Sequence, residues 1–343
     1  MPATPLAGTS TRQPLRELFG RLTTIKPQDV KVTIGMDLGS SAIKVLVLGP
    51  KKGAGPRALL GQQLAPMPAG DADPSDAIKS AVIKLHIPVR AVNLSVSGQW
   101  VIMRIIEMPS MKPAEIRQAL PYEAQRYLPF SIQDVVVDGL VLGPADANKV
   151  WVLIVACKKE LIERRIDWVR RAGMDVALID VDALALTNAY LAGARKPEGT
   201  RALIHVGAQL TNLVILRGDI PYLVRDIPWG GEKLARAVAD QLQLDAEAVT
   251  KALTENQIAD ELREALHQWV EPLVTELELS FDYFENRFGQ PPEEALVSGG
   301  MGQSAAFQGA LKSHLAQSVA PWAPASGVSS QFAVAYGLAL RTL

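Results

Sequence analysis

The chain has 343 residues, of which 48% are hydrophobic, and a formal net charge of −1 at pH 7. This composition supports a packed core and argues against a polyanionic partner such as nucleic acid. At roughly 150 residues per domain, the length predicts about two domains. A single cysteine, Cys157, excludes an internal disulfide framework and is typical of a reducing compartment.

Metal-binding motifs and membrane spans are both missing from the sequence. It has no CxxC or HExxH motif and no Cys/His cluster, which argues against a structural metal site. Its apolar runs either fall short of the ~20 residues that cross a bilayer or contain acids, such as Asp180 and Asp182. We therefore expect no transmembrane segment.

The first predicted structure is a β-hairpin, "KVTIGMDL" and "AIKVLVLG", whose turn carries Asp37, Gly39, Ser40, Ser41 and Lys44. Glycine lets backbone N–H groups approach an anion, while hydroxyls and a lysine add donors and positive charge. The aspartate could orient Mg²⁺ through water. The turn therefore predicts a phosphate site; an ordinary Gly-Ser hairpin with an exposed lysine is the alternative.

The middle of the chain alternates helices and strands around a compact insert. A helix is predicted over "DPSDAIKSAVIKLH" and a strand over "VRAVNLSVSG". The insert then reads as a strand, a proline-bounded helix, two strands and a helix, from "WVIMRIIEM" to "KKELIERRIDWVRRAGM". Pro121 lies within its first helix and predicts a kink or a break. The strand "VALIDVD" and the helix "ALALTNAYLAGA" follow.

A polar junction, "RKPEGT", separates the two halves of the chain. After it, "RALIHVGAQLTNLVILRGDIPYLVRDIP" predicts three strands, and a long helical stretch follows. "ALVSGGMG" predicts a strand ending in Ser298, Gly299 and Gly300, a surface free of large side chains on which a nucleoside could lie. "PWGGEKL" puts Gly231 and Glu232 at a helix start. Ordinary helix-entry turns are the alternative for both motifs.

The opening hairpin is repeated after the junction. "IGMDLGSSAIKVLVLG" aligns with "ALIHVGAQLTNLVILR", with matching apolar positions throughout the second strand. Two copies of one unit, each opening a half of the chain, predict a duplicated α/β fold with its ligand site between the halves. The aligned polar and glycine positions are Asp37 with His205, Gly39 with Gly207, and Lys44 with Asn212.

These motifs in this order resemble the actin/Hsp70 nucleotide-binding superfamily. "DLGSSAIK" and "HVGAQLTN" look like its two phosphate loops, and "VSGGMG" like its adenosine motif. Within it, the chain resembles the PilM family of type IV pilus assembly and, more distantly, the division protein FtsA. The insert carries the closer likeness, because "RIIEMPSMKPAEIRQALPYEAQRYLPF" has the PilM-like run of apolar strand, Met-Pro, amphipathic helix and Tyr-x-Pro-Phe.

The resemblance implies an α/β fold of the actin-like, duplicated ribonuclease-H-like, two-lobed type with an SHS2-like 1C insert. The implied boundaries are 1–30 for a flexible tail, 31–99 with 175–198 for subdomain 1A, 100–174 for 1C, 199–231 with 289–330 for 2A, 232–288 for 2B, and 331–343 for a C-terminal helix returning to 1A.

The resemblance also implies a site for ATP or ADP with Mg²⁺. The expected nucleotide-binding residues are Asp37, Gly39, Ser40, Ser41, Lys44, Gly207, Thr211, Gly231, Glu232, Ser298, Gly299 and Gly300. Asp37 is also the expected catalytic residue and the magnesium ligand through water. Asp182 is a second catalytic candidate, at a position where the superfamily often keeps an acid or amide; a helix N-cap is the alternative and the preferred reading.

The second phosphate loop departs from the superfamily pattern Asp-x-Gly-x-x-Thr. His205 stands at the Asp position and Leu210 at the Thr position, although Thr211 and Asn212 remain. A neutral imidazole is a poor substitute for a carboxylate that holds magnesium waters, and leucine cannot donate to a phosphate. We therefore expect nucleotide binding with very slow hydrolysis, and not an efficient ATPase.

The family resemblance implies a membrane partner. PilM-like proteins bind the cytoplasmic N-terminal peptide of PilN, a bitopic inner-membrane protein, in a groove between 1A and 1C. The helix around Tyr122 to Tyr127 and its adjoining strands are the expected wall. This implies a cytoplasmic protein, peripheral at the inner membrane, that works with other pilus or secretion components. An active ATPase or sugar-kinase relative, an FtsA-like filament former and a type II secretion component are the alternatives.

Overall fold

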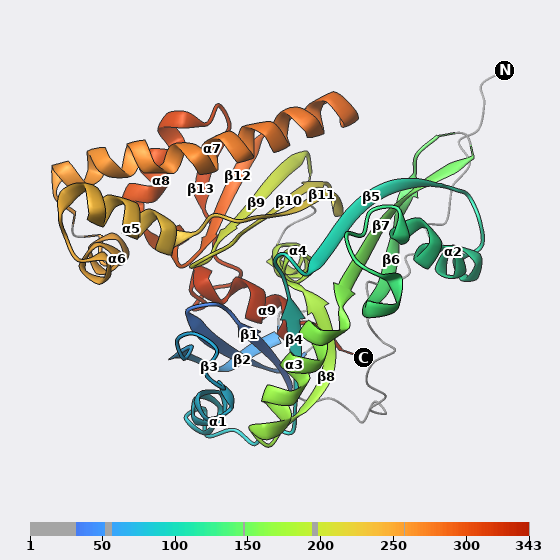
Figure 1. Ribbon diagram of the computed structural model, residues 1–343, viewed down its shortest axis with the longest axis horizontal. Helices are drawn as coiled ribbons and strands as arrows, with labels where there is room; N and C mark the ends of the chain where they lie inside the picture. Colours follow the sequence, from blue (N-terminus) through green and yellow to red (C-terminus); the bar gives the residue numbers. More distant parts are fainter. Residues whose placement is uncertain (1–31, 52–56, 147, 194–197, 257, 343) are drawn as a thin grey trace.

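The computed structural model describes residues 32–342 except for 52–56, 147, 194–197 and 257. The first half of the chain builds a five-stranded sheet in the order β3-β2-β1-β4-β8 (Figure 1). Its first three strands are antiparallel, whereas β4 and β8 run parallel to β1. The strands are β1 (Thr33–Leu38), β2 (Ala42–Lys51), β3 (Arg57–Pro66), β4 (Ala91–Val96) and β8 (Asp175–Val181).

The second half builds a sheet of the same design, in the order β11-β10-β9-β12-β13. Here too an antiparallel three-stranded unit is extended by two parallel strands. The strands are β9 (Thr200–Val206), β10 (Thr211–Arg217), β11 (Ile220–Ile227), β12 (Glu294–Gly299) and β13 (Ser318–Pro321). The identical strand order confirms the predicted duplication, and we call the two halves the first and the second lobe.

The two hairpin turns are equivalent residue by residue. Asp37 pairs with Lys44 across β1 and β2, as His205 pairs with Asn212 across β9 and β10. Each turn is closed by a backbone hydrogen bond from its glycine, Gly39 N to Ala42 O at 3.1 Å and Gly207 N to Leu210 O at 2.9 Å. The aligned positions in the sequence are therefore aligned in space.

Helices cover the two sheets. In the first lobe they are α1 (Ser75–Ile83), α3 (Lys159–Arg171), α4 (Asp182–Gly193) and the C-terminal α9 (Ala333–Ala339). Helix α9 packs against β1 and α4, where glycines allow close approach: a Cβ on Gly337 would lie 1.8 Å from the carbonyl oxygen of Ala185. In the second lobe they are α5 (Gly231–Leu242), α6 (Ala246–Thr254), α7 (Asp260–Phe288) and α8 (Ala305–His314).

The insert forms a third, antiparallel sheet in the order β5-β7-β6, which projects from the lobes in Figure 1. Its strands are β5 (Val101–Pro109), β6 (Val135–Pro144) and β7 (Lys149–Lys158), and α2 (Pro113–Gln125) covers one face. Ile116 and Leu120 of α2 are buried against Ile106 and Ile154 of the sheet. The subdomain boundaries expected from the family resemblance stay a prediction.

The structure differs from the sequence-based predictions at one helix and two strands. The sequence predicted a kink or a break at Pro121. The helix is not broken there, because α2 continues through the proline, which is exposed; the kink stays a prediction. Strands β3 and β13 were not predicted, since most of β3 is exposed or half-buried and β13 has only four residues. The predicted tail, 1–30, lies outside the described residues.

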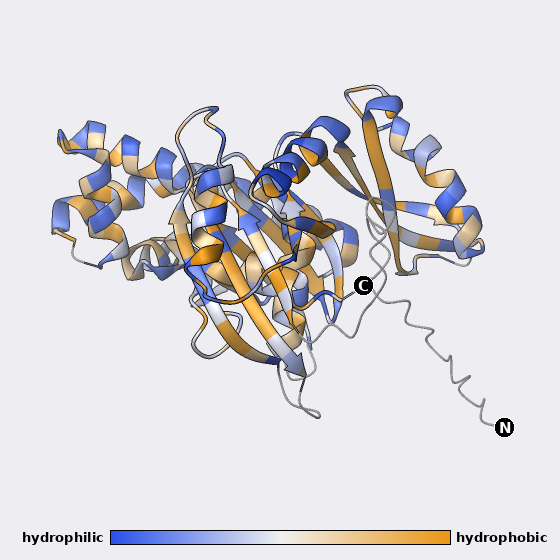
Figure 2. Cartoon of the chain, turned by 90° about the horizontal axis from the view of Figure 1, so that it is seen from below, coloured by the Kyte–Doolittle hydropathy of each residue, from blue (hydrophilic) through white to orange (hydrophobic). Residues whose placement is uncertain are grey.

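Hydrophobic residues follow the central strands, while the outer helices carry mixed polar and apolar faces (Figure 2). Met36, Ile43 and Leu94 are fully buried in the first lobe, and Phe284 and Phe307 in the second. The first of these hydrophobic clusters extends into the second lobe, where it includes Leu203 and Val214. No helix within the described residues combines the length and the apolar character needed to cross a bilayer.

Candidate functional site

The first turn is built around an ion pair. Lys44 Nζ donates to Asp37 Oδ2 at 2.8 Å, and the two side chains are only 14% and 8% exposed. Strand register places them directly opposite each other on β1 and β2. Ser40 and Ser41, at the tip of the turn, are exposed. The structure therefore brings together the acid, the lysine and the hydroxyls that the sequence predicted for one site.

A second carboxylate, that of Asp182, lies close to the first turn at the start of α4. Burial, followed by the charge of Asp37, raises the pKa of Asp182 to about 6, against the lowering effect of the Ser95 and Ser97 hydroxyls. The charge of Asp37 contributes to this shift, so the Asp182 carboxylate lies within electrostatic reach of the first turn, and its catalytic role stays a prediction.

Arg165 of α3 completes the charged group in the first lobe, and sequence reasoning missed it. Its Nη1 donates to the carbonyl oxygen of Leu38, next to Gly39. Burial lowers the pKa of Arg165, and the charges of Asp182 and Asp37 oppose this, so the guanidinium lies within electrostatic reach of both acids. In the sequence it is one of several arginines on a charged helix and gives no signal of its own.

His205 faces this group from the second lobe. Burial, followed by the positive charge of Lys44, lowers the pKa of His205 to about 4, and Asp37 opposes the shift. The ring is therefore neutral at pH 7. Its Nδ1 lies 3.0 Å from the hydroxyl oxygen of Ser298 at the end of β12. We call Asp37, Lys44, Arg165, Asp182 and His205 the interlobe cluster.

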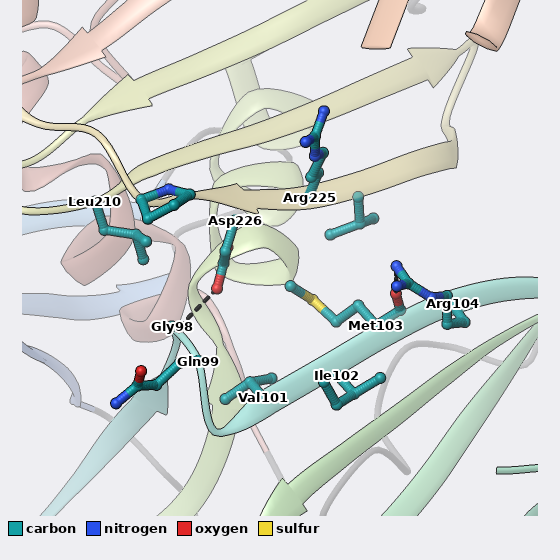
Figure 3. Close-up of a pocket in the computed structure, with 11 residues that line it drawn as sticks. Gly98, Gln99, Val101, Ile102, Met103, Arg104, Leu210, Arg225 and Asp226 are labelled. Atoms are coloured by element: carbon teal, nitrogen blue, oxygen red, sulfur yellow. Dashed lines mark hydrogen bonds between the residues drawn. The ribbon is translucent and has the colours of Figure 1, made fainter. Parts of the chain in front are cut away.

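Other residues of the second turn have structural hydrogen bonds. The buried Thr211 hydroxyl donates to the carbonyl oxygen of Trp229 at 2.8 Å. Asn212 Nδ2 donates to Asp226 Oδ1 at 2.8 Å, and the backbone N–H of Gly98 donates to Asp226 Oδ2 at 2.7 Å. Figure 3 shows the Asp226 carboxylate directed at Gly98. This hydrogen bond joins the first lobe to the second.

The predicted nucleoside surface is a tight glycine turn. Gly299 has φ of +90°, and a Cβ there would lie 2.3 Å from the carbonyl oxygen of Val206, so glycine is required. Gly300 has open space where a Cβ would be. Gly231 N donates to Gly207 O at 2.9 Å, which ties the start of α5 to the second turn. Beside it, the Glu232 carboxylate accepts a hydrogen bond from Gln209.

Two pockets lie between the insert and the second lobe. One, of about 320 Å³, is lined by β5 and β11 and includes Gly98, Met103 and Asp226 (Figure 3). The other, of about 490 Å³, continues along β5 toward α7 and includes Leu279 and Tyr283. Both stand beside the edge strand β5 of the insert, and the smaller one also reaches Leu210 of the second turn and Asp226, the partner of Asn212.

The insert also presents exposed aromatic side chains. Tyr122 of α2 and Tyr127 just beyond it are exposed. Lys158 Nζ lies 3.8 Å from the ring centroid of the partly exposed Trp100 and 5.1 Å from that of Phe130. We call these five residues the aromatic junction; it contains the segment expected to form the wall of the partner groove.

The described residues do not fit a magnesium site of the expected kind. Mg²⁺ needs oxygen ligands, but Lys44 occupies Asp37 Oδ2 and a neutral imidazole stands at the second acidic position. Within the described part of the chain, no group of three His, Cys, Asp or Glu side chains is placed to hold a metal ion. Glycine turns and buried cations nevertheless fit the phosphates of a nucleotide.

Comparisons with known proteins give the family. A model of the type IV pilus assembly protein PilM matches residues 35–343. A chain of a solved PilM–PilN type IV pilus biogenesis complex is 27% identical, with a TM-score of 0.77 over 90% of this chain and 97% of that one.

More distant structures share the fold alone. The ethanolamine utilization protein EutJ from Carboxydothermus hydrogenoformans is 14% identical, with a TM-score of 0.53 over 95% of this chain and 93% of its own. A ROK family glucokinase from Streptomyces griseus, solved with glucose and AMPPNP, is 15% identical, with a TM-score of 0.52 over 90% and 98%. The fold is thus actin-like and two-lobed, and the chain belongs to the PilM family of type IV pilus assembly proteins.

Proposed function

We propose that this chain is the actin-like scaffold of a type IV pilus machine and binds the cytoplasmic N-terminal peptide of a PilN-like inner-membrane protein. The observation that carries the proposal is the family match over residues 35–343, together with the likeness to a chain solved in a PilM–PilN complex. Such binding would hold a cytoplasmic protein at the inner membrane, where it can engage other pilus components.

The aromatic junction is the proposed wall of the peptide groove. Its exposed tyrosines, and a lysine that lies over a tryptophan ring, offer both apolar area and polar contacts, as binding hot spots do. Extended peptides are commonly captured in grooves of this kind. Tyr122 lies in α2 and Tyr127 just after it, and we propose that they contact the peptide from the side of the insert.

A peptide titration tests this proposal. The fluorescently labelled N-terminal peptide of a PilN-like protein is titrated with the full chain, and polarisation reports binding. Tyr127→Ala is expected to weaken binding about tenfold, since a buried tyrosine anchor contributes ~1.4 kcal/mol or more. Ile83→Ala, at an exposed residue on α1, is the matched control. Absence of binding by the wild type would overturn the proposal.

We further propose that the cleft still binds ATP or ADP while hydrolysis is degraded. The support is the first turn with its lysine, the glycine turn at Gly299 and Gly300, and the loss of the second acid at His205. Losing one preorganised contact to developing charge typically costs ~100- to 1,000-fold in rate. Purified protein should therefore show no Mg²⁺-dependent ATP turnover above background.

An active ATPase is the second candidate, because Asp182 lies beside Asp37 with its pKa raised to about 6, which suits a general base. Turnover that requires Mg²⁺ and disappears in both Asp37→Ala and Asp182→Asn would favour this candidate over the degraded site. Turnover that persists in both variants would indicate a contaminating enzyme.

A further inference from the structure

The first-lobe part of the interlobe cluster balances its own charge. It contains two carboxylates, Asp37 and Asp182, and two cations, Lys44 and Arg165. Lys44 is bonded directly to Asp37, and Arg165 feels the charge of both acids. The acid that faces them from the second lobe, Asp226, accepts hydrogen bonds from Gly98 and Asn212. Asp37 and Asp226 therefore already have partners, without a divalent ion.

Both cations keep donors for which the structure gives no acceptor among the described residues. An ammonium group has three N–H donors, and one from Lys44 is given to Asp37. The guanidinium of Arg165 donates through Nη1 to Leu38, while its buried Nε makes no hydrogen bond with any described residue. A buried, unpaired N–H carries a desolvation cost that a ligand oxygen would remove.

The position of Arg165 suits a phosphate. Its guanidinium is tied to the backbone that enters the first turn, one residue before Gly39. A planar guanidinium matches the oxygens of a phosphate, and a charge-assisted hydrogen bond is roughly twice as strong as a neutral one. Since no sequence motif marks this arginine, only the fold makes it a candidate for binding a phosphate.

We propose that the cleft binds ADP or ATP without Mg²⁺, and that Arg165 and Lys44 contact the phosphates in place of the metal. This inference rests on the nucleotide binding proposed above. In a related cleft with two free acids, the metal would screen the phosphates from the carboxylates. Here the resident cations provide that screening, and His205 adds no negative charge.

Calorimetric titration of the full chain with ADP, in EDTA and in excess Mg²⁺, tests the proposal. The wild-type Kd is expected to differ by less than about threefold between the two buffers, because no metal contact is gained. Arg165→Gln should weaken ADP binding about tenfold or more in both, through loss of a charge-assisted hydrogen bond. Arg165→Lys keeps the positive charge but lacks the planar guanidinium, so its affinity for ADP should lie between those of the wild type and Arg165→Gln.

Arg164→Gln is the matched control, since Arg164 is the exposed neighbour on the same helix and packs on Trp168. It should bind ADP as the wild type does. Thermal melts show whether each variant is folded. Wild-type affinity that rises tenfold with Mg²⁺, or an Arg165→Gln variant that binds normally, overturns the inference. No ADP binding in either buffer overturns it together with the proposed nucleotide site, while the peptide titration decides the scaffold function separately.

Discussion

At the scale of single residues, His205 has the clearest consequence for stability. Its folded-state pKa of about 4 lies below the ordinary value of 6.5 because the neutral ring is buried. The unfolded chain therefore takes up a proton at a higher pH than the folded one. The contribution of the neutral ring to the free energy of unfolding is complete above pH 6.5. It is lost as the pH falls from 6.5 toward 4.

This linkage gives a testable pH dependence. From pH 7.5 to pH 5, the wild type should lose about 2 kcal/mol more unfolding free energy than His205→Gln, which cannot titrate. Urea unfolding at the two pH values measures the unfolding free energies of the wild type and of His205→Gln. Parallel pH profiles of the wild type and His205→Gln would show that the ring is not buried in its neutral form.

Asp182 should behave in the opposite sense. Its folded-state pKa is raised to about 6 from 3.8, so folding disfavours the ionised carboxylate. The resulting loss of folding stability is complete above pH 6. Asp182→Asn is therefore expected to raise the melting temperature at pH 8, and the gain should shrink as the pH falls from 6 to 4. A variant that melts lower than the wild type at pH 8 would contradict this account of the carboxylate.

The sequence could predict some of these residues and not others. The juxtaposition of Asp37, Gly39 and Lys44 could be predicted, because a hairpin turn places them together by local spacing alone. Arg165 could not be found, because its approach to the first turn depends on how α3 packs against the sheet. Thr211 was expected at the phosphate, yet its hydroxyl donates to a carbonyl nearby, a bond that depends on the path of the chain after β11.

At the scale of elements, the contact between α4 and α9 is fixed by glycine. Because a Cβ on Gly337 would lie 1.8 Å from the carbonyl oxygen of Ala185, Gly337→Ala must push the two helices apart. We expect a loss of about 3 kcal/mol or more in unfolding free energy, at the upper end of overpacking effects. Chemical denaturation measures it.

Gly309→Ala in α8 is the control for this prediction. It has open space where the Cβ would be, so alanine should leave stability unchanged or raise it by about 0.5–1 kcal/mol. Equal effects at Gly309 and Gly337 would mean that helix propensity, and not the close helix contact, decides the outcome.

Elements with strong local signals were predicted well. The hairpins of both lobes have alternating or fully apolar strands around glycine turns, and both were identified with the correct pairing. Strand β3 was missed because its side chains are mostly exposed or half-buried, and its place depends on pairing with β2. Helix α2 was expected to kink or break at Pro121, but it is continuous, and the buried side chains of Ile116 and Leu120 hold it on the insert sheet.

At the scale of the whole molecule, Asp226 connects the lobes. Its carboxylate accepts from Gly98 N of the first lobe and from Asn212 of its own lobe. Asp226→Ala should therefore accelerate hydrogen exchange at the Gly98 amide, while the amides of β12 keep their protection. Mass-spectrometric exchange measures both. Unchanged protection at Gly98 would mean that the lobes are held together by other contacts.

The central claim, that this PilM-family chain is held at the membrane by a PilN-like segment, is tested most directly by flotation. The purified full chain is mixed with proteoliposomes that carry a PilN-like protein, either intact or lacking its N-terminal cytoplasmic peptide. We predict that the chain floats with the intact protein and stays at the bottom of the gradient with the truncated one. The claim would be contradicted if the chain floated equally with both kinds of proteoliposome, or if it floated with neither.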